Sequence, residues 1–197
     1  GIRAKKAIDI PFPQAVPLIY AIDRRYCIDC KLCDAVCGKD AINFNQKDEE
    51  LKLNAGAIIV STGYELLDPS GLEEYGYGKI KNVISNLQFE RILSPSGPTS
   101  GHVRKPTDGK SVKKIAFIQC VGSRDVRHNP YCSQICCMAS TKEAVVAKEH
   151  DSEIDATILY MDLRSFGKGF QEYVNKAKDD FGVNYIRGRV AYVSENP

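Results

Sequence analysis

Four cysteines, Cys27, Cys30, Cys33 and Cys37, lie within eleven residues in the spacing C-x2-C-x2-C-x3-C and form a first thiol set. Thiols so close together wrap one short loop around a single centre, which is the arrangement that an iron–sulfur cluster requires. Zinc is a weaker alternative, because structural zinc sites usually separate their two cysteine pairs by about a dozen residues or more. A disulfide is also disfavoured, because a ring over two intervening residues is strained.

The last cysteine of this run, Cys37, has two possible assignments. In proteins with two such clusters the fourth cysteine of each run binds the neighbouring cluster, and by that rule Cys37 serves another centre. The sequence contains no second run of this spacing, so Cys37 either completes a single cluster or pairs with a run outside these residues. Position 38 is glycine where the bacterial pattern has proline, which makes the match incomplete.

The other four cysteines, Cys120, Cys132, Cys136 and Cys137, form a second thiol set. Cys120 follows a predicted strand, at the carboxyl end where open α/β sheets place their ligands. If a helix began near Tyr131, Cys132 and Cys136 would share one face and Cys137 would point about 100° away. All three converge only if the helix begins later. Our leading interpretation is a second iron–sulfur cluster, with Cys120 as the fourth ligand.

Several alternatives stay open for the second set. Cys136 and Cys137 could act as a reactive or peroxide-sensitive vicinal dithiol, or the cysteines could be buried as small apolar side chains. Zinc is the least favoured alternative. His128 could replace a cysteine ligand, as histidine does in Rieske centres, although a loop histidine is more often solvated. Three cations could offset the charge of a thiolate cluster or simply cover an exposed face: Arg124, Arg127 and Lys142.

The turn after the predicted strand lacks the glycines of a dinucleotide site. Such a site needs G-x-G-x-x-G so that a pyrophosphate can meet the backbone, and residues 119–124 read QCVGSR. Asp162 follows the next predicted strand, where nucleotide-binding folds place a ribose-binding acid. Without the glycine-rich turn, a solvent-facing or capping role is the better interpretation. No residue stands out as a general acid or base, so we predict ligands and no catalytic side chain.

The elements that must position the second set are predicted from residue 113 onwards. Short apolar runs alternate with helix-length segments, which is typical of parallel strands joined by helical crossovers. This is half of a doubly wound sheet, so the predicted fold class is α/β with a partial Rossmann-like domain. The expected order is strand 115–119, helix 137–150, strand 157–161, helix 169–181 and strand 184–186.

The earlier part of the chain carries fewer regular signals. Three prolines predict an extended chain over residues 1–26. Alternating patterns around a charged turn within 41–54 predict a β-hairpin. The apolar run 56–60 predicts a strand buried on both faces. Residues 64–110 are rich in turn formers and predict a surface connection with one helix at 86–93.

Composition limits the function classes. The chain has 197 residues and a net charge of +2, from 27 Lys and Arg against 25 Asp and Glu, so a nucleic-acid partner is not favoured. No apolar run, Ala57–Val60 included, approaches the roughly 20 residues of a membrane-spanning helix, and no secretory signal opens the sequence. We therefore expect a cytoplasmic protein without membrane insertion. Eight cysteines in a reducing compartment favour metal or redox chemistry over disulfides.

Four segments carry a resemblance to a known family. They are GAIIVSTG at Gly56–Gly63, FIQCVGSRD at Phe117–Asp125, YCSQICCM at Tyr131–Met138 and DLRSFGKG at Asp162–Gly169. In these segments, and over essentially all 197 residues, the sequence resembles the A-type subunit of the heterodisulfide reductases. The resemblance implies a flavoprotein of the thioredoxin-reductase type with a ferredoxin-like insertion, carrying FAD and several [4Fe-4S] clusters.

The resemblance assigns roles to individual residues. The first three cysteines of the first set match the ligands of one cluster in the ferredoxin-like insertion, and Cys37 matches a ligand of the neighbouring cluster. All four cysteines of the second set match an unusual cluster site close to the flavin. Thr62 and Gly63 match a Thr-Gly step at a strand end whose backbone approaches FAD, although an ordinary strand-terminating turn has the same sequence.

The resemblance also divides the chain. It implies a partial ferredoxin-like iron–sulfur lobe at 1–55, a flavin-domain strand with a connecting segment at 56–110, and a Rossmann-like half-domain at 111–197. The family's glycine-rich FAD turn, an earlier cysteine run and a C-terminal ferredoxin portion have no counterpart here. We therefore expect this segment to bind FAD poorly and to be inactive alone. Cluster thiols occupy the turn that would bind NADPH, so NADPH is not expected to bind.

The activity implied for the parent protein is that of an oxidoreductase acting on sulfur groups. In it, FAD splits electron pairs between two paths and the clusters relay single electrons. The implied partners are the other heterodisulfide reductase subunits, a hydrogenase or other electron-donor subunit, and ferredoxin. Two alternatives stay open: a subunit of a related quinone-interacting complex, and a non-catalytic metal-binding module with a thiol redox switch at Cys136 and Cys137.

Overall fold

The computed structural model describes residues 6–10 and 14–195. Within it the chain divides into two units, Ala4–Leu66 and Leu67–Pro197. The first thiol set lies in the former unit and the second in the latter. The three-part division expected from the resemblance stays a prediction.

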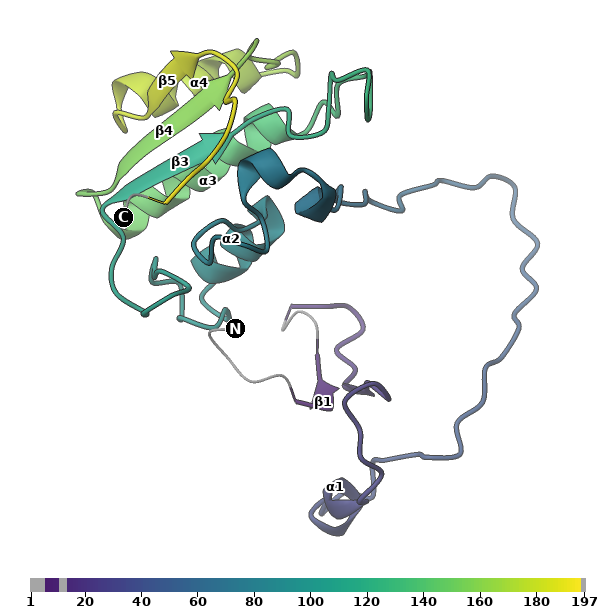
Figure 1. Ribbon diagram of the computed structural model, residues 1–197. Helices are drawn as coiled ribbons and strands as arrows, with labels where there is room; N and C mark the ends of the chain where they lie inside the picture. The colour runs from purple at the N-terminus through teal and green to yellow at the C-terminus, as the bar shows by residue number, and fades with distance from the viewer. Residues whose placement is uncertain (1–5, 11–13, 196–197) are drawn as a thin grey trace. The chain divides into compact units, whose positions relative to one another are not determined.

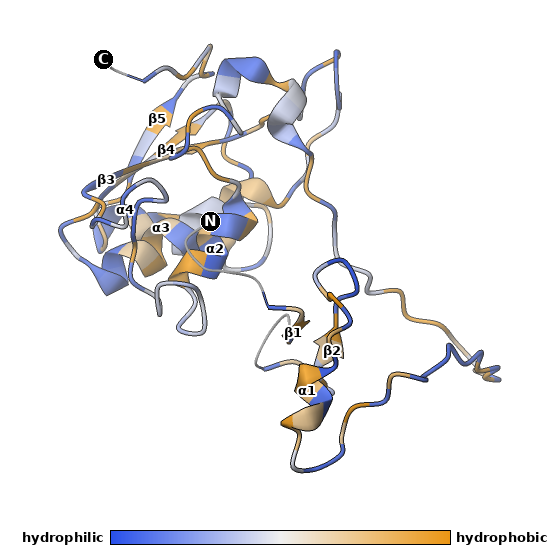
Figure 2. Ribbon diagram, turned by 60° about the horizontal axis from the view of Figure 1, so that its bottom comes forward, coloured by the Kyte–Doolittle hydropathy of each residue, from blue (hydrophilic) through white to orange (hydrophobic). Residues whose placement is uncertain are grey.

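The unit Leu67–Pro197 is built on a parallel three-stranded sheet. Its strands β3 (Lys114–Ile118), β4 (Asp155–Tyr160) and β5 (Asn184–Arg187) lie side by side in that order. The crossovers are α3 (Cys136–His150) and α4 (Phe170–Asp179), which lie on the same side of the sheet (Figures 1 and 2). The α/β class and the predicted order of elements are confirmed, whereas the Rossmann-like and ferredoxin-like assignments stay predictions.

Three shorter helices precede the sheet. They are the 3-10 turns η1 (Pro69–Gly71) and η2 (Glu73–Tyr75) and the helix α2 (Asn86–Leu93), which is predicted correctly from the sequence. A capping box fixes the start of α2, because Ser85 Oγ accepts a hydrogen bond from Gln88 N at 3.3 Å while Gln88 Oε1 accepts one from Ser85 N at 2.8 Å. Helix α2 packs against α3.

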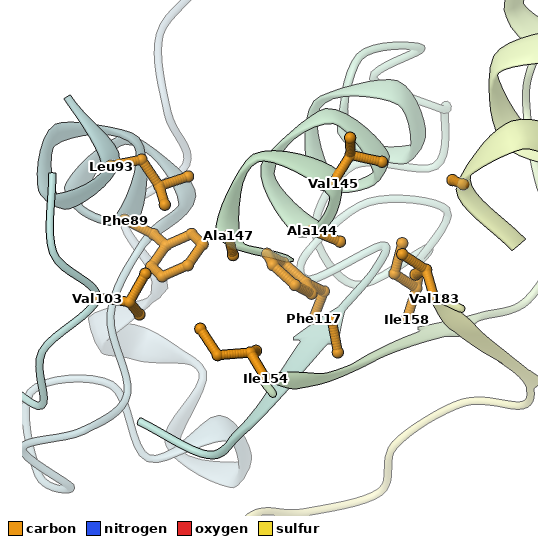
Figure 3. Close-up of a cluster of buried hydrophobic side chains, with 12 residues drawn as sticks. Phe89, Leu93, Val103, Phe117, Ala144, Val145, Ala147, Ile154, Ile158 and Val183 are labelled. Atoms are coloured by element: carbon orange, nitrogen blue, oxygen red, sulfur yellow. The ribbon is translucent and has the colours of Figure 1, made fainter. Parts of the chain in front are cut away.

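The core of this unit lies between the sheet and the helices (Figure 3). Phe117 of β3 and Phe89 of α2 meet edge to face with ring centroids 5.6 Å apart. Ala144 and Ala147 are fully buried and let α3 approach the sheet closely. Ile158 at the centre of β4 is also fully buried. This packing holds the first turn of α3 beside the carboxyl end of β3, where the second thiol set lies.

The unit Ala4–Leu66 has little regular structure. Strands β1 (Ile8–Asp9) and β2 (Ala21–Ile22) pair antiparallel, and α1 (Leu32–Ala35) is a single turn. Ile10 is the only buried hydrophobic residue among the described residues of this unit. Apolar packing therefore contributes little to its stability.

Two predictions for this unit are wrong. Residues 41–54 form no hairpin, and the run 56–60 is not a buried strand, since Ile58 and Ile59 are 84% and 90% exposed. A strand needs a neighbour to satisfy its backbone N–H and C=O groups, and no described segment pairs with this run. An apolar sequence alone does not supply that neighbour.

Within the described residues, none of the helices has both the length and the apolar composition that crossing a bilayer would require.

Candidate metal centres

The second thiol set gathers where β3 ends and α3 begins. Cys120 comes two residues after β3, and Cys136 and Cys137 are the first two residues of α3. Helix α3 begins later than Tyr131, which is the condition for convergence derived from the spacing. Cys120 and Cys137 are buried, while Cys132 and Cys136 are half-buried.

The loop between Cys120 and Cys132 is folded back on itself by hydrogen bonds. Arg124 N donates to Tyr131 O at 2.9 Å, and Asn129 N donates to Gly122 O at 3.2 Å. Gly122 adopts a φ of +62°, and a Cβ there would lie 2.0 Å from Leu67 Cδ2. Glycine is therefore favoured at position 122, because other residues rarely adopt this φ and because a Cβ would clash with Leu67. These hydrogen bonds close the loop that connects Cys120 with Cys132.

Cys136 interacts with the thiols of both Cys120 and Cys137. Hydrogen bonds from the Cys120 and Cys137 thiols lower the pKa of Cys136 to about 2. The same contacts, followed by burial, raise the pKa of Cys120 and of Cys137 well above the usual range. The thiolate of Cys136 is thus favoured, whereas those of Cys120 and Cys137 are disfavoured, first by their hydrogen bonds to Cys136 and then by burial. A cationic centre would allow all of them to ionise.

Asp162 connects the second set to two arginines. Its carboxylate accepts a hydrogen bond from Arg124 Nη2 at 2.8 Å and another from Arg187 Nη2 at 3.2 Å. Its backbone carbonyl lies 3.9 Å from Cys137 Sγ. The hydrogen bond from Arg124 is the largest cause that lowers the pKa of Asp162. The Asp162 side chain is 42% exposed, as the solvent-facing interpretation expects, and it also forms ion pairs beside the thiols.

The other candidate residues around this site face different partners. Arg127 binds Asp125 through two hydrogen bonds at 3.1 and 2.8 Å, and Lys142 Nζ binds Glu90 Oε1 at 2.7 Å. His128 is exposed in the loop. Of the three cations suggested by the sequence, Arg124 is the one that the structure connects to the thiols.

The first thiol set surrounds a small cavity. Three of its four members, Cys27, Cys30 and Cys33, line a cavity of about 130 Å³. The apolar side chains that line the same cavity are Ile8, Ile22, Ile28 and Phe44. Cys37 follows α1, and its sulfur accepts a hydrogen bond from Ala41 N at 3.4 Å. The assignment of Cys37 to a separate centre stays a prediction.

Both thiol sets share a local motif that sequence reasoning missed. Asp29 N donates to Cys27 Sγ at 3.4 Å, and Gln134 N donates to Cys132 Sγ at 3.4 Å. In each case the donor lies two residues after the cysteine and has a positive φ, 53° for Asp29 and 62° for Gln134. A non-glycine residue in this conformation is uncommon, and neither residue type signals it in the sequence.

Among the described residues, no three His, Cys, Asp or Glu side chains converge on a point that could hold a single metal ion. The ligand assignments at both sets therefore stay proposals.

Comparison with known proteins identifies the family. The chain is 51% identical over 198 aligned residues to the A-type iron-sulfur subunit of the CoB–CoM heterodisulfide reductase of Methanocaldococcus jannaschii, and the alignment covers all of this chain and 30% of that protein. It is 50% identical, with the same coverage, to the A-type subunit of the H2:CoB–CoM heterodisulfide,ferredoxin reductase of Methanothermobacter marburgensis. Over its whole length the chain is therefore homologous to a segment of the heterodisulfide reductase A-type subunits.

The chain is also similar to the A-type subunit of a ferredoxin/F420H2-dependent CoB–CoM heterodisulfide reductase from Methanosarcina acetivorans. The two are 47% identical over 98% of this chain and 24% of that protein. The chain spans about 30% of the length of the first two curated relatives. No protein-family model matches it.

The remaining residues that this family resemblance singles out are Thr62 and Gly63. Both are exposed and follow the run 56–60, and Gly63 adopts a φ of +74°. They belong to the unit Ala4–Leu66, whereas the second thiol set belongs to the other unit. Their role in binding FAD stays a prediction.

Proposed function

We propose that this chain is an electron-transfer segment that holds [4Fe-4S] clusters at both thiol sets. Cys27, Cys30 and Cys33 bind one cluster, and Cys37 serves a neighbouring one. The four cysteines of the second set, Cys120, Cys132, Cys136 and Cys137, bind another. The observation that carries the proposal is the N–H donor to sulfur at Cys27 and again at Cys132, because backbone hydrogen bonds to sulfur favour the thiolate that iron requires.

The buried polar atoms around the second set fit a group that accepts hydrogen bonds. Gln119, which precedes Cys120, is only 6% exposed, and both atoms of its amide lack a partner among the described residues. Arg124 Nη1 is buried and equally unpartnered there. Buried donors without acceptors are costly, so Gln119 Nε2 and Arg124 Nη1 point to an acceptor that the described residues do not provide, whereas Gln119 Oε1 would need a donor. The sulfides of an iron–sulfur cluster are such acceptors.

The protein residues would bind the cluster and keep water from it. A bound [4Fe-4S] cluster supplies reversible one-electron transfer. The unpaired N–H groups in the first turn of α3 favour negative charge at Cys136 and Cys137. Burial of Cys120 and Cys137 excludes solvent from one side of the set. Hydrogen bonds and burial of this kind set the reduction potential of such centres.

The role in the parent protein is proposed from the family. These relatives are named as heterodisulfide reductases, and one of them as an iron-sulfur subunit. We infer an oxidoreductase in which clusters relay electrons to and from FAD, with electron bifurcation at the flavin. Thr62 and Gly63 would contribute to the FAD site of the parent. The partners would be the other reductase subunits, ferredoxin, and a hydrogenase or other electron donor, in the cytoplasm.

The test is spectroscopic. We expect the anaerobically reconstituted chain to show two electron paramagnetic resonance signals after reduction, one lost in Cys30→Ser and the other in Cys120→Ser. Cys37→Ser is the matched variant, because it removes a thiol that does not line the cavity, and we expect it to retain the signal of the first set. A reconstituted wild-type chain that takes up no iron and gives no signal would contradict the proposal.

One second function has a specific observation in its favour. Cys136 and Cys137 are adjacent, share a hydrogen bond, and differ in their tendency to ionise. These are features of a reactive dithiol, so a redox switch at this pair is the alternative. It predicts that alkylation of Cys136 proceeds equally in the presence and absence of bound iron, whereas a cluster ligand would be protected by iron.

A further inference from the structure

The charges near the second thiol set are not equally balanced. Lys142 binds the Glu90 carboxylate, and Arg127 shares the buried Asp125 carboxylate with Arg189. The side chains of Arg127 and Lys142 are 66% and 48% exposed. Arg124 is 24% exposed and shares the Asp162 carboxylate with Arg187. Two guanidinium groups thus face one carboxylate, which leaves an excess positive charge beside the thiols.

The geometry of the loop directs this charge toward the thiols. Cys120, Gly122 and Arg124 all have positive φ, and Ser123 N donates to Cys120 O at 3.2 Å. This tight turn carries the chain back past Cys120. Arg124 lies four residues after Cys120 on this turn.

Asp162 fixes the orientation of the guanidinium. Its carboxylate accepts from Arg124 Nη2 at 2.8 Å, and its backbone carbonyl lies 3.9 Å from Cys137 Sγ. Asp162 therefore contacts both Arg124 and Cys137. The other terminal nitrogen, Nη1, is buried and has no partner among the described residues, so its hydrogens are available to a bound group.

We propose that Arg124, oriented by Asp162, is the residue that raises the reduction potential of the centre bound by the second thiol set. This inference rests on the proposed function, because it requires a cluster at that set. A cluster gains one negative charge on reduction, and a partly buried positive charge beside it stabilises the reduced form. Arg127 and Lys142 should have less effect, because their side chains are 66% and 48% exposed against 24% for Arg124, and solvent screens an exposed charge.

The experiment is a potentiometric titration followed by electron paramagnetic resonance. All chains carry Cys30→Ala, so that only the second centre contributes to the signal. We expect Arg124→Gln to keep its iron and to titrate at a lower midpoint potential than the reference chain, which carries Cys30→Ala alone. Arg124→Lys, which keeps the charge, should titrate closer to the reference chain. Arg127→Gln is the matched control, because it removes an equal charge from the same loop, and its midpoint should change less.

The outcomes separate the two proposals. Iron content is measured first. A reference chain without iron at the second set overturns the proposed function and this inference with it. An iron-containing Arg124→Gln chain with the same midpoint potential as the reference chain overturns only the role of Arg124. An equal lowering in Arg124→Gln and Arg127→Gln also overturns it, since the effect would then follow net charge rather than the position of Arg124. Arg124→Lys keeps the question answerable if Arg124→Gln fails to fold.

Discussion

Hydrogen bonds and ion pairs distinguish these cysteines from buried structural ones. At Cys27 and Cys132 a backbone N–H two residues later donates to sulfur. Near Cys137, the Asp162 carbonyl contacts the sulfur and the Asp162 carboxylate binds Arg124. The cysteine types and their spacing could be predicted from the sequence. The donors could not, because they depend on a positive φ at Asp29 and Gln134 that neither residue type announces.

A buried carboxyl on α3 gives a prediction about pH. Glu143 is fully buried, and one of its oxygens accepts a hydrogen bond from Asn86 Nδ2 at 2.7 Å. Burial, the largest cause, raises the pKa of Glu143 to about 8 from 4.5. The folded state therefore binds a proton that the unfolded state releases between these values, so the free energy of unfolding should fall as pH rises from about 5 to about 8.

The measurement is urea unfolding at several pH values. Glu143→Gln removes the ionisation, so its stability should gain on the wild type as pH rises, by roughly 2–4 kcal/mol at pH 8.5. Glu149→Gln on the same helix is the control, because Glu149 is exposed, and it should follow the wild type. Parallel pH profiles for wild type and Glu143→Gln would show that Glu143 does not titrate in this way.

Helix α3 is the element on which the site depends. Its start at Cys136 places two thiols in the first turn, and its packing against the sheet fixes that turn beside Cys120. The alternation of apolar runs predicts all three strands and both crossovers to within a few residues, because each element is long enough to show its period. The start of α3 is predicted to within one residue, at 137 against Cys136, although Ile135 at its N-cap provides no side-chain cap.

The capping box of α2 gives an element-scale prediction. Ser85→Ala removes the hydroxyl that accepts from Gln88 N, and should lower the free energy of unfolding by about 1 kcal/mol. Ser85→Asp keeps an acceptor at the same place and should stay close to the wild type. Urea unfolding of the three chains decides the matter, and an alanine variant as stable as the wild type would show that the box does not hold the helix.

The whole chain consists of two units with different sources of stability. Leu67–Pro197 has a continuous apolar core, whereas Ala4–Leu66 has one buried hydrophobic residue among those described. The sequence indicated the α/β unit correctly, but it also suggested a hairpin and a buried strand before residue 61 that do not form. Those runs have strand-like composition without a neighbouring strand, and pairing partners cannot be deduced from one segment alone.

This contrast predicts the effect of removing metal. Stripping iron from the reconstituted chain with a chelator should raise amide hydrogen exchange across the described part of Ala4–Leu66 to nearly unprotected rates, because ligand binding there replaces a core. Exchange in β3, β4 and α3 should change much less. Mass spectrometry of the two states measures this, and equal protection of residues 14–60 with and without iron would contradict the prediction.

The central claim is that two independent iron–sulfur centres exist in this chain. Iron and acid-labile sulfide per chain, measured after anaerobic reconstitution of the wild type, Cys30→Ala and Cys120→Ala, test it most directly. We predict about eight irons in the wild type and about four in each variant, as expected for two [4Fe-4S] clusters. If Cys120→Ala keeps all of the wild-type iron, the second set is not a cluster site and the claim of two centres is wrong.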